Sequence, residues 1–351
     1  MATCLFIVQG EGKGHMSQAL ALKEYLDAAG HSVEAVFLGT GSPHEIPDYF
    51  RNVFAHKLHT FRSPSFLRTP NKKGIYVART ILFNLLYSFA YLKEIARIRK
   101  EINSIKPDVI FNFYELLGAL AMRSINPGIR KIGVGHHFYL FLNKGLCRIG
   151  PVWHRWLLRM HSRMIIKSCD RVLALSFNKE PGTDDIQVIP PLVRKEFREM
   201  KRVPGDSYLV YLLQEGFFYD LVKLARANPH FKADVFTSLS PAIEIPEGIR
   251  IHPYDAKKFS TLMSSCKGLI TTAGFDSAAE AACHGIPLAV IPSLNHFEQR
   301  CNGADITMKG IGVSVKGIDQ GILDRMFSFD AQEYRAWVEQ AGEMIINSME
   351  K

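Results

Sequence analysis

Residues 268–292 read GLITTAGFDSAAEAACHGIPLAVIP, and this stretch decides the fold. The apolar run at its start is typical of a buried parallel strand, which a glycine ends. We predict a helix that is capped by Asp276 or Ser277 and ends near His284, where a glycine and a proline follow. The run LAVI then predicts a second buried strand, so the stretch forms a strand–turn–helix–strand unit.

The turn between this first strand and the helix is suited to an anion. The first N–H groups of a helix lack partners within the helix, and the helix dipole adds partial positive charge there. Gly274 lets a phosphate come close to the backbone, and Glu280 can accept hydrogen bonds from a diol such as ribose. Ser277 and Glu280 also fit a capping box, in which Glu280 only satisfies a backbone N–H group. Both interpretations stay open at this point.

A second unit of the same kind opens the chain. Residues 4–8 predict a strand, the glycine loop GEGKGH follows at 10–15, a helix extends to a glycine at position 30, and residues 31–37 predict the next strand. A dinucleotide site needs the spacing GxGxxG and an acidic residue after the second strand. The loop lacks this spacing, and Leu38 and Gly39 stand where the acidic residue would follow the second strand. Both observations argue against a nicotinamide cofactor.

Together these patterns resemble the GT-B glycosyltransferases. The motifs are TTAGF at 271–275, SxxEA at 277–281, HGIPLAVIP at 284–292, an acid–amide pair at 298–299 and the glycine loop at 10–15. They are similar to the group that contains the peptidoglycan-precursor UDP-GlcNAc transferase and related UDP-sugar transferases. The resemblance implies an α/β fold of two doubly wound, Rossmann-like domains facing a cleft.

The resemblance also implies roles for single residues. The glycine-rich turn would hold the diphosphate of the donor, Glu280 its ribose, and Glu298 with Gln299 the sugar hydroxyls. The expected donor-binding residues are Gly12, Gly14, Thr272, Gly274, Phe275, Ser277, Glu280, Glu298 and Gln299. No metal and no cofactor is expected, because a helix N-terminus can stabilise the leaving diphosphate and no Asp-x-Asp motif is present.

Three residues are candidates for the catalytic base. His15 directly follows the glycine loop, and an imidazole titrates near neutral pH, although His15 could instead only orient the loop. The resembled family often has Asp where Asn112 stands, so Glu115 is either its replacement or the residue before a helix that starts at 116. His137 follows a predicted strand, and loop hydrogen bonding is the alternative role for it.

The length of 351 residues allows two domains of ordinary size. We predict an acceptor-binding domain over 1–203, a nucleotide-sugar domain over 204–330, and a terminal helix over 331–351 that packs back on the first domain. The six cysteines are scattered and no signal peptide is visible, which favours reduced thiols and a cytoplasmic location.

The two halves differ in charge. Residues 1–203 hold 30 Lys or Arg and 16 Asp or Glu, a net +14, and residues 204–351 hold 13 and 18, a net −5, which gives the total of +9. Residues 75–92 approach the length of a membrane span, but Arg79 and Asn84 interrupt them, so an amphipathic helix fits better. Its basic flanks are Arg62, Arg68, Lys72, Lys73, Lys93, Arg97, Arg99 and Lys100. This pattern suits an anionic membrane surface, and a core helix with solvated ends is the alternative.

The sequence therefore predicts an inverting, metal-independent glycosyltransferase that moves a sugar from a UDP-sugar to a hydroxyl acceptor. The acceptor is expected to be lipid-linked, and the protein peripheral on the cytoplasmic face of a membrane. A nucleotide-sugar 2-epimerase of the same fold is one alternative. The other is a non-enzymatic protein that senses a nucleotide and binds membrane or nucleic acid. Nucleic acid is not expected as a partner, because the basic stretches carry no recognition motif beyond their charge.

Overall fold

The structure is a computed structural model, and it describes residues 1–350 apart from 12, 42–45, 66, 68–75, 144, 204, 213–215 and 238–242. The predicted roles of Gly12, Arg68, Lys72 and Lys73 therefore lie outside the described residues. The chain forms two compact units. The first consists of residues 1–67, 77–194 and 336–351, and the second is formed by residues 195–335.

The first unit is built on a seven-stranded sheet in which every paired strand is parallel. In spatial order its strands are β3 (Leu58–Arg62), β2 (Ser32–Thr40), β1 (Thr3–Gln9), β4 (Val109–Phe113), β5 (Arg130–Gly135), β6 (Arg171–Leu175) and β7 (Ile186–Ile189). The interior residues of β1 and all of β4 are buried. Continuous burial of this kind is expected of a parallel sheet that helices cover on both faces.

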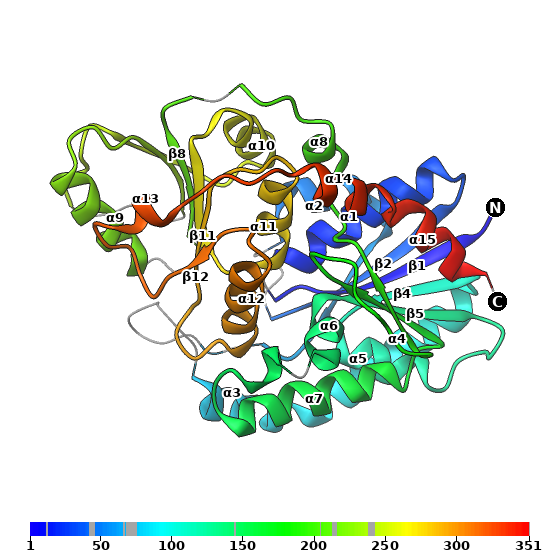
Figure 1. Ribbon diagram of the computed structural model, residues 1–351. Helices are drawn as coiled ribbons and strands as arrows, with labels where there is room; N and C mark the ends of the chain where they lie inside the picture. Colours follow the sequence, from blue (N-terminus) through cyan, green and yellow to red (C-terminus); the bar gives the residue numbers. More distant parts are fainter. Residues whose placement is uncertain are drawn as a thin grey trace. The chain divides into compact units, whose positions relative to one another are not determined.

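Helices lie on both faces of this sheet (Figure 1). On one face are α1 (Gly14–Ala28) and α15 (Ala341–Met349), and on the other α4 (Ser88–Ile105), α5 (Leu116–Met122) and α7 (Val152–Ile166). The shorter helical segments are α2 (Asp48–Phe54), η2 (Ala55–Lys57), α3 (Val77–Leu86), α6 (His136–Leu142) and η3 (Leu146–Arg148). The helix predicted at 75–92 is thus two helices, which meet at Tyr87.

The C-terminal segment contributes two helices, where the sequence suggested one. They are α14 (Gln332–Glu339) and α15, with Gln340 between them. Within the first unit, the indole N–H of Trp337 donates to the carbonyl of Ser176 at 3.0 Å, and α15 packs against α1 and β5. A side chain at Gly342 would meet the ring of Tyr25 at 3.0 Å, so the glycine allows this close packing.

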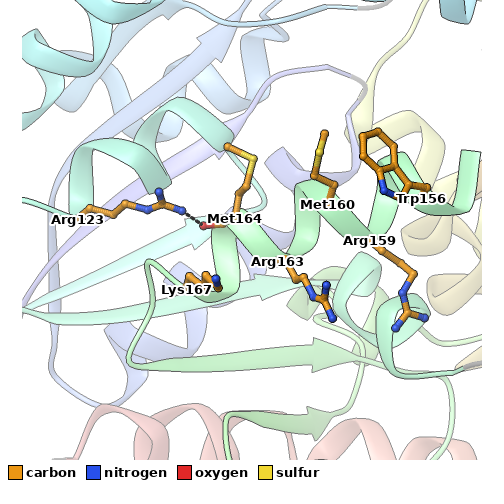
Figure 2. Close-up of a pocket in the computed structure, with 7 residues that line it drawn as sticks. All are labelled: Arg123, Trp156, Arg159, Met160, Arg163, Met164 and Lys167. Atoms are coloured by element: carbon orange, nitrogen blue, oxygen red, sulfur yellow. Dashed lines mark hydrogen bonds between the residues drawn. The ribbon is translucent and has the colours of Figure 1, made fainter. Parts of the chain in front are cut away.

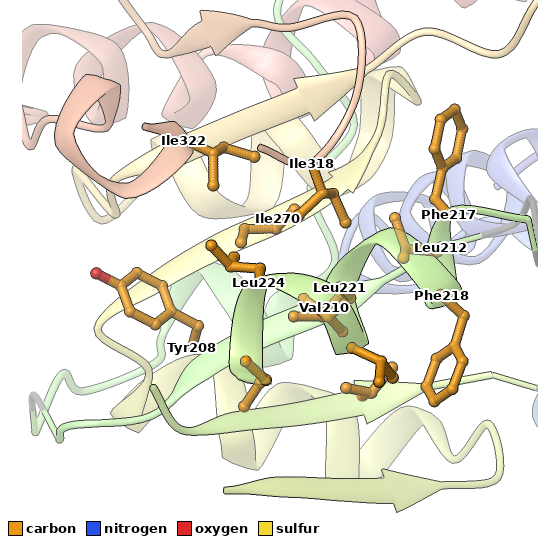
Figure 3. Close-up of a cluster of buried hydrophobic side chains, with 14 of the residues drawn as sticks. Tyr208, Val210, Leu212, Phe217, Phe218, Leu221, Leu224, Ile270, Ile318 and Ile322 are labelled. Atoms are coloured by element: carbon orange, nitrogen blue, oxygen red, sulfur yellow. The ribbon is translucent and has the colours of Figure 1, made fainter. Parts of the chain in front are cut away.

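The second unit has a six-stranded parallel sheet. Its spatial order is β10 (Ile249–His252), β9 (Ala233–Phe236), β8 (Tyr208–Tyr211), β11 (Gly268–Thr272), β12 (Leu288–Ile291) and β13 (Val313–Ser314). Its helices are α8 (Lys195–Arg198), α9 (Gly216–Ala227), α10 (Ala256–Ser265), α11 (Phe275–Ala282), α12 (Phe297–Met308) and α13 (Ile322–Arg325). Figure 3 shows α9 burying Phe217, Leu221 and Leu224 in a cluster that includes Val210 of β8 and Ile270 of β11.

Each sheet reverses its strand order once, between β1 and β4 in the first unit and between β8 and β11 in the second. The loops that leave neighbouring strands at such a point go to opposite faces and leave a crevice at the carboxyl ends of the strands. The structure confirms the predicted pair of doubly wound α/β domains. It also points to the loops after β1, β4, β8 and β11 as places to look for a site.

Candidate functional site

The turn between β11 and α11 ends in a helix N-terminus that no side chain caps. Gly274 is the N-cap residue, with φ −79° and ψ 144°, and α11 starts at Phe275. The predicted caps, Asp276 and Ser277, were wrong, because both lie inside the first turn of the helix. The capping-box interpretation is wrong for the same reason, since Ser277 and Glu280 are the third and sixth residues of α11 and neither closes its end.

Gly274 differs from Gly10, the glycine at the corresponding point of the first unit. A side chain at Gly10 would meet the carbonyl oxygen of Gly39 at 2.5 Å, so close packing of the loop requires glycine there. A side chain at Gly274 would meet no atom of the described residues nearer than 3.8 Å, and the backbone conformation is one that any residue adopts. Neither packing nor conformation within the protein explains a glycine at 274, whereas close contact with a ligand would.

Seven of the nine predicted donor residues lie in the second unit, on β11, at this turn, on α11 and on α12, while Gly14 begins α1 of the first unit. Thr272, Phe275 and Glu280 are buried on β11 and α11, while Glu298 and Gln299 lie in the first turn of α12. Further residues fix α12 in place. The side chain of His296 caps the helix by accepting from the Gln299 N–H at 3.4 Å, and Asn302 donates to the carbonyl of Ala273 at 3.0 Å.

Sequence reasoning missed Asn302, because no local pattern marks an asparagine that reaches a turn twenty-nine residues earlier. Gln299 has one of its two polar groups engaged, since its Oε1 accepts from the Ser293 N–H at 2.8 Å. Its Nε2 group makes no hydrogen bond to the described part of the chain, so this group is the one that can donate to a sugar hydroxyl.

The first unit contains a cluster of four aromatic rings at the carboxyl ends of β1, β4 and β5. His137 stacks on Tyr114 with ring centroids 3.9 Å apart, and His15 stacks on His137 at 5.4 Å. The ring of His161, from α7, meets Tyr114 edge-on at 4.7 Å. The cluster lies at the strand-order reversal between β1 and β4, which is where ligands bind in sheets of this kind.

His15 is oriented by Gln18, one turn further along α1. Its Nδ1 lies 3.2 Å from the amide oxygen of Gln18, so Nδ1 carries the proton and donates it to that bond. The basic lone pair of the imidazole is then on Nε2. This is the arrangement that a general base needs, and an amide takes the orienting role that a carboxylate has in a His–Asp pair.

Glu115 and Asn112 together build the start of α5. The side chain of Glu115 caps this helix by accepting from the Gly118 N–H, and also accepts from the Ser63 hydroxyl at 2.7 Å. Asn112 accepts from the Glu115 N–H at 2.8 Å and donates to its carbonyl at 2.9 Å. This confirms the interpretation of Glu115 as the residue before a helix that starts at 116. Burial raises the pKa of this carboxyl to about 7, against the opposing effect of these hydrogen bonds.

The two adjacent histidines begin α6 and have different roles. His136 bonds through Nδ1 to the carbonyl of Leu175 at 2.8 Å, which ties the start of α6 to the end of β6. His137 joins the ring cluster. Among the residues that the structure describes, no three His, Cys, Asp or Glu side chains are grouped as metal ligands.

Tyr114, His161 and Lys13 were not found from the sequence. Tyr114 has φ +56°, a left-handed conformation that is rare for a residue with a bulky side chain and that tends to occur at functional sites. Burial, followed by the charges of His137 and His15, lowers the pKa of His161 to about 3, so this imidazole is neutral at physiological pH. Burial also lowers the pKa of Lys13, in the glycine loop, to about 8.

A different surface of the first unit exposes apolar side chains. On α3 and α4, the exposed residues are Ile81, Leu82, Leu85, Leu86, Phe89 and Leu92, and Phe89 is 81% exposed. Polar side chains of the same two helices face the protein instead. Asn84 bonds to Ser65 and to the hydroxyl of Tyr91, and Thr80 accepts from the Leu67 N–H.

The exposed side of α3 and α4 is therefore apolar, so the core-helix alternative is wrong. Exposed apolar patches of this kind mark contact with a membrane or another protein. Of the predicted basic flanks, Arg97 is paired with Glu94 and Glu101. No helix in the described part of the chain combines the length and the hydropathy that a transmembrane span needs.

The raised pKa of Glu115 predicts a pH dependence of stability. The pKa is about 7 in the folded protein and near 4.5 without burial, so the folded state binds the proton more tightly. This contribution is fully present below pH 4.5 and is lost as the pH rises through 7, and it amounts to about 3 kcal/mol.

Glu115→Gln keeps the side chain neutral at every pH. Between pH 5 and pH 8, urea unfolding should show the wild type losing about 2 to 3 kcal/mol relative to this variant. Glu339→Gln, at an exposed position of the same unit, should parallel the wild type. Parallel curves for Glu115→Gln and wild type would mean that Glu115 is ionised when buried.

Comparison with known proteins places these features in a family. The profile of glycosyl transferase family 1 matches residues 2–328. An uncharacterized glycosyltransferase of Methanosarcina mazei is 25% identical over 331 residues, which are 88% of this chain and 84% of the relative. Among solved structures, the glycosyltransferase of kitacinnamycin superposes with a TM-score of 0.63 at 15% identity, over 99% of both chains. MurG of Acinetobacter baumannii superposes with a TM-score of 0.60 at 13% identity, also over 99% of both chains.

The structural likeness, at these low identities, establishes the fold, and it agrees with the two parallel sheets described above. The sequence match establishes the family, because it spans nearly the whole chain. The chain belongs to glycosyl transferase family 1 and is a sugar-transferring enzyme with the GT-B fold.

Proposed function

We propose that the enzyme transfers a sugar from a nucleoside-diphosphate sugar, a UDP-sugar, to a hydroxyl group of a lipid-linked acceptor, with inversion at the anomeric carbon and without a metal ion or other cofactor. The observation that carries this proposal is the uncapped N-terminus of α11 beside Gly274. Its first N–H groups and its dipole can hold a diphosphate.

The chemistry needs a base and a stabilised leaving group. The acceptor oxygen attacks the anomeric carbon as the bond from that carbon to the diphosphate oxygen breaks. The hydroxyl proton passes to the base, for which Nε2 of His15 is the proposed atom. Negative charge grows on the departing diphosphate, and preorganised N–H groups can stabilise it in the way that a divalent cation does in other enzymes.

The remaining donor contacts follow from the side chains around the turn. Glu280 is buried one turn into α11, and its carboxylate is proposed to accept hydrogen bonds from the ribose hydroxyls. Gln299 keeps an Nε2 donor available and Glu298 precedes it in the first turn of α12, so this pair is proposed to bind the sugar. Thr272, Phe275 and Ser277 frame the same turn.

Nucleotide binding to α11 is measurable without knowing the acceptor. A ligand that binds only the folded state stabilises it by about 2.7 kcal/mol at a hundredfold excess over Kd. We expect UDP to raise Tm more than dTDP, GDP or ADP. Glu280→Gln should weaken UDP binding by tenfold or more, because it removes a charged acceptor.

Glu247→Gln, at an exposed site of the same unit, is the matched control and should bind UDP like the wild type. If Glu280→Gln binds UDP normally and only lowers the Tm of the unliganded protein, Glu280 has a structural role. If no nucleoside diphosphate raises Tm, the α11 turn is not the donor site.

The role of His15 is tested by turnover. UDP release from UDP-sugars, with a lipid extract of the source organism as acceptor, should fall by about 10² to 10⁴-fold in His15→Ala, while the Tm shift with UDP is retained. His56→Ala, at an exposed histidine of the same unit, is the control and should keep full activity. Unchanged turnover in His15→Ala would move the base to another member of the ring cluster, His137. UDP release that does not depend on acceptor would favour the 2-epimerase.

The apolar surface of α3 and α4 is proposed to contact the cytoplasmic face of a membrane that holds the acceptor. Its leucine and phenylalanine side chains can enter the interfacial region, and the exposed basic residues Arg79, Lys93 and Lys100 flank them. Each basic residue near an anionic leaflet contributes about 1 kcal/mol. Together these features describe peripheral attachment and require no membrane span.

Leu86→Glu combined with Phe89→Glu should reduce co-sedimentation with phospholipid vesicles by about tenfold or more. The two apolar side chains that would enter the membrane are then replaced by charged ones. Val203→Glu combined with Met308→Glu changes two equally exposed side chains of the second unit and should leave vesicle binding near the wild-type level. Equal loss in both double variants would make the effect one of net charge and would contradict the assignment of this surface.

A further inference from the structure

A groove along α7 joins cations to apolar side chains. It has a volume of about 400 Å³ and is lined by Arg123, Trp156, Arg159, Met160, Arg163, Met164 and Lys167. Six of these residues, from Trp156 to Lys167, have spacings that place them on one face of α7 or just beyond its end, and Arg123 reaches in from the end of α5. Figure 2 shows Trp156, Met160 and Met164 projecting along one edge of this face and Arg159 and Arg163 along the other.

The cations of the groove lack compensating acids. From residue 116 to residue 169 the sequence contains nine Lys or Arg and no Asp or Glu. Arg155, Arg159, Arg163 and Lys167 follow one another at intervals of four residues, a spacing at which like charges destabilise a helix. In the described part of the chain, Arg159, Arg163 and Lys167 form no ion pair. The negative end of the helix dipole partly offsets Arg163 and Lys167, but it does not reach Arg155 or Arg159.

Arg123 is fixed in a position to bind an anion. Its Nε donates to the hydroxyl of Ser168 and its Nη2 to the carbonyl of Met164, both at 2.9 Å (Figure 2). Its Nη1 group is left as a donor at the edge of the groove. A guanidinium held in this way loses little side-chain entropy when it binds a phosphate oxygen.

The apolar edge of the groove identifies the kind of anion. Trp156 is 59% exposed and Met160 41%, and Trp153 in the preceding turn is also exposed. Tryptophan beside Lys and Arg is typical of residues at the interface between lipid headgroups and acyl chains. The lining contains no Asp, Glu, Asn, Gln, Ser or Thr, so it offers no side-chain acceptor for the edge of a nucleobase.

We propose that the α7 groove binds the phosphate group of an anionic glycerophospholipid, with Arg123, Arg159, Arg163 and Lys167 around the phosphate and Trp156 and Met160 against the glycerol and upper acyl chain. The groove shares no lining residue with the ring cluster, although His161 of that cluster also belongs to α7. It extends the proposed membrane attachment, because α5 packs between α4 and α7 on the same face of the first sheet. It gives that attachment a selectivity for headgroups that apolar side chains alone do not have.

The test is vesicle binding of the full chain without nucleotide sugar, so that it is independent of transfer activity. Arg163→Ala combined with Lys167→Ala should weaken binding to phosphatidylcholine–phosphatidylglycerol vesicles by about 30-fold, and should not change binding to pure phosphatidylcholine vesicles. The control, Lys257→Ala with Lys258→Ala, removes the same charge from exposed positions of α10 and should have little effect. The double variant Leu86→Glu, Phe89→Glu should instead weaken binding to both kinds of vesicle.

Equal loss in the groove variant and its control would overturn the proposal, since general electrostatic attraction would then suffice. Displacement of the wild type from vesicles by millimolar inorganic phosphate at constant ionic strength would also overturn it, in favour of a site for free phosphate. So would tight binding of single-stranded RNA that the groove variant loses while its vesicle binding is intact.

A second measurement does not depend on removing cations. Bromine on the acyl chains of phosphatidylglycerol should quench the fluorescence of the wild type, and Trp156→Phe should remove a large part of this quenching. Trp153 and Trp337 are the other two tryptophans, and Trp337 is buried and should not be quenched. Identical quenching in wild type and Trp156→Phe would show that the groove does not lie at the lipid.

Discussion

Parallel pairing of strands is the constraint on which the other features depend. A parallel strand must be followed by a crossover, and in both sheets most of the crossovers contain a helix. In the described residues, the connections from β6 to β7 and from β9 to β10 contain none. Where the strand order reverses, the neighbouring crossovers go to opposite faces of the sheet. A crevice then forms at the carboxyl ends of the strands, and helix N-termini border it. The ring cluster of the first unit and the α11 turn of the second both lie at such a reversal. Each unit therefore offers chemistry at its strand ends for a topological reason.

The two points at which the strand order reverses carry different chemical groups. In the second unit the turn after β11 offers backbone N–H groups, an unoccupied space over Gly274 and buried polar side chains from α11 and α12. That combination suits a phosphate and a diol. In the first unit the rings of His15, Tyr114, His137 and His161 dominate, and burial keeps at least His161 neutral. Neutral imidazoles suit proton transfer. The difference agrees with a transferase in which one unit binds the donor and the other activates the acceptor.

The excess of basic residues is not spread evenly over the first unit. Some of the basic residues bond to other groups of the protein. Arg97 forms ion pairs with Glu94 and Glu101, and Arg123 donates to the carbonyl of Met164 near the end of α7. Others stand beside exposed apolar side chains on α4 and α7. In water, placing a cation beside an exposed tryptophan or leucine contributes little to stability. At a membrane surface, the cation can pair with a lipid headgroup while the apolar side chain enters the interfacial region, and both contacts favour binding. The net charge of the first unit does not distinguish the basic residues that are paired within the protein from those that lie beside exposed apolar side chains.

The sequence by itself determined the two doubly wound domains, the glycine turns and the strand–turn–helix–strand unit of residues 268–292. These features depend on local periodicity and on residues close together in the chain, which is why they can be read in order along it. The helix boundaries were less accurate: α11 starts before both predicted caps, because an extended glycine can end a strand and begin a helix without a side-chain cap.

Only the tertiary structure decided which side of α3 and α4 faces solvent, that Glu115 is a buried cap, and that Tyr114 and His161 join His15 and His137. These assignments depend on contacts between residues far apart in the chain, such as Glu115 with Ser63 and Tyr114 with His161. An amphipathic pattern gives two faces but does not say which of them meets the protein, because that choice depends on the partner surface.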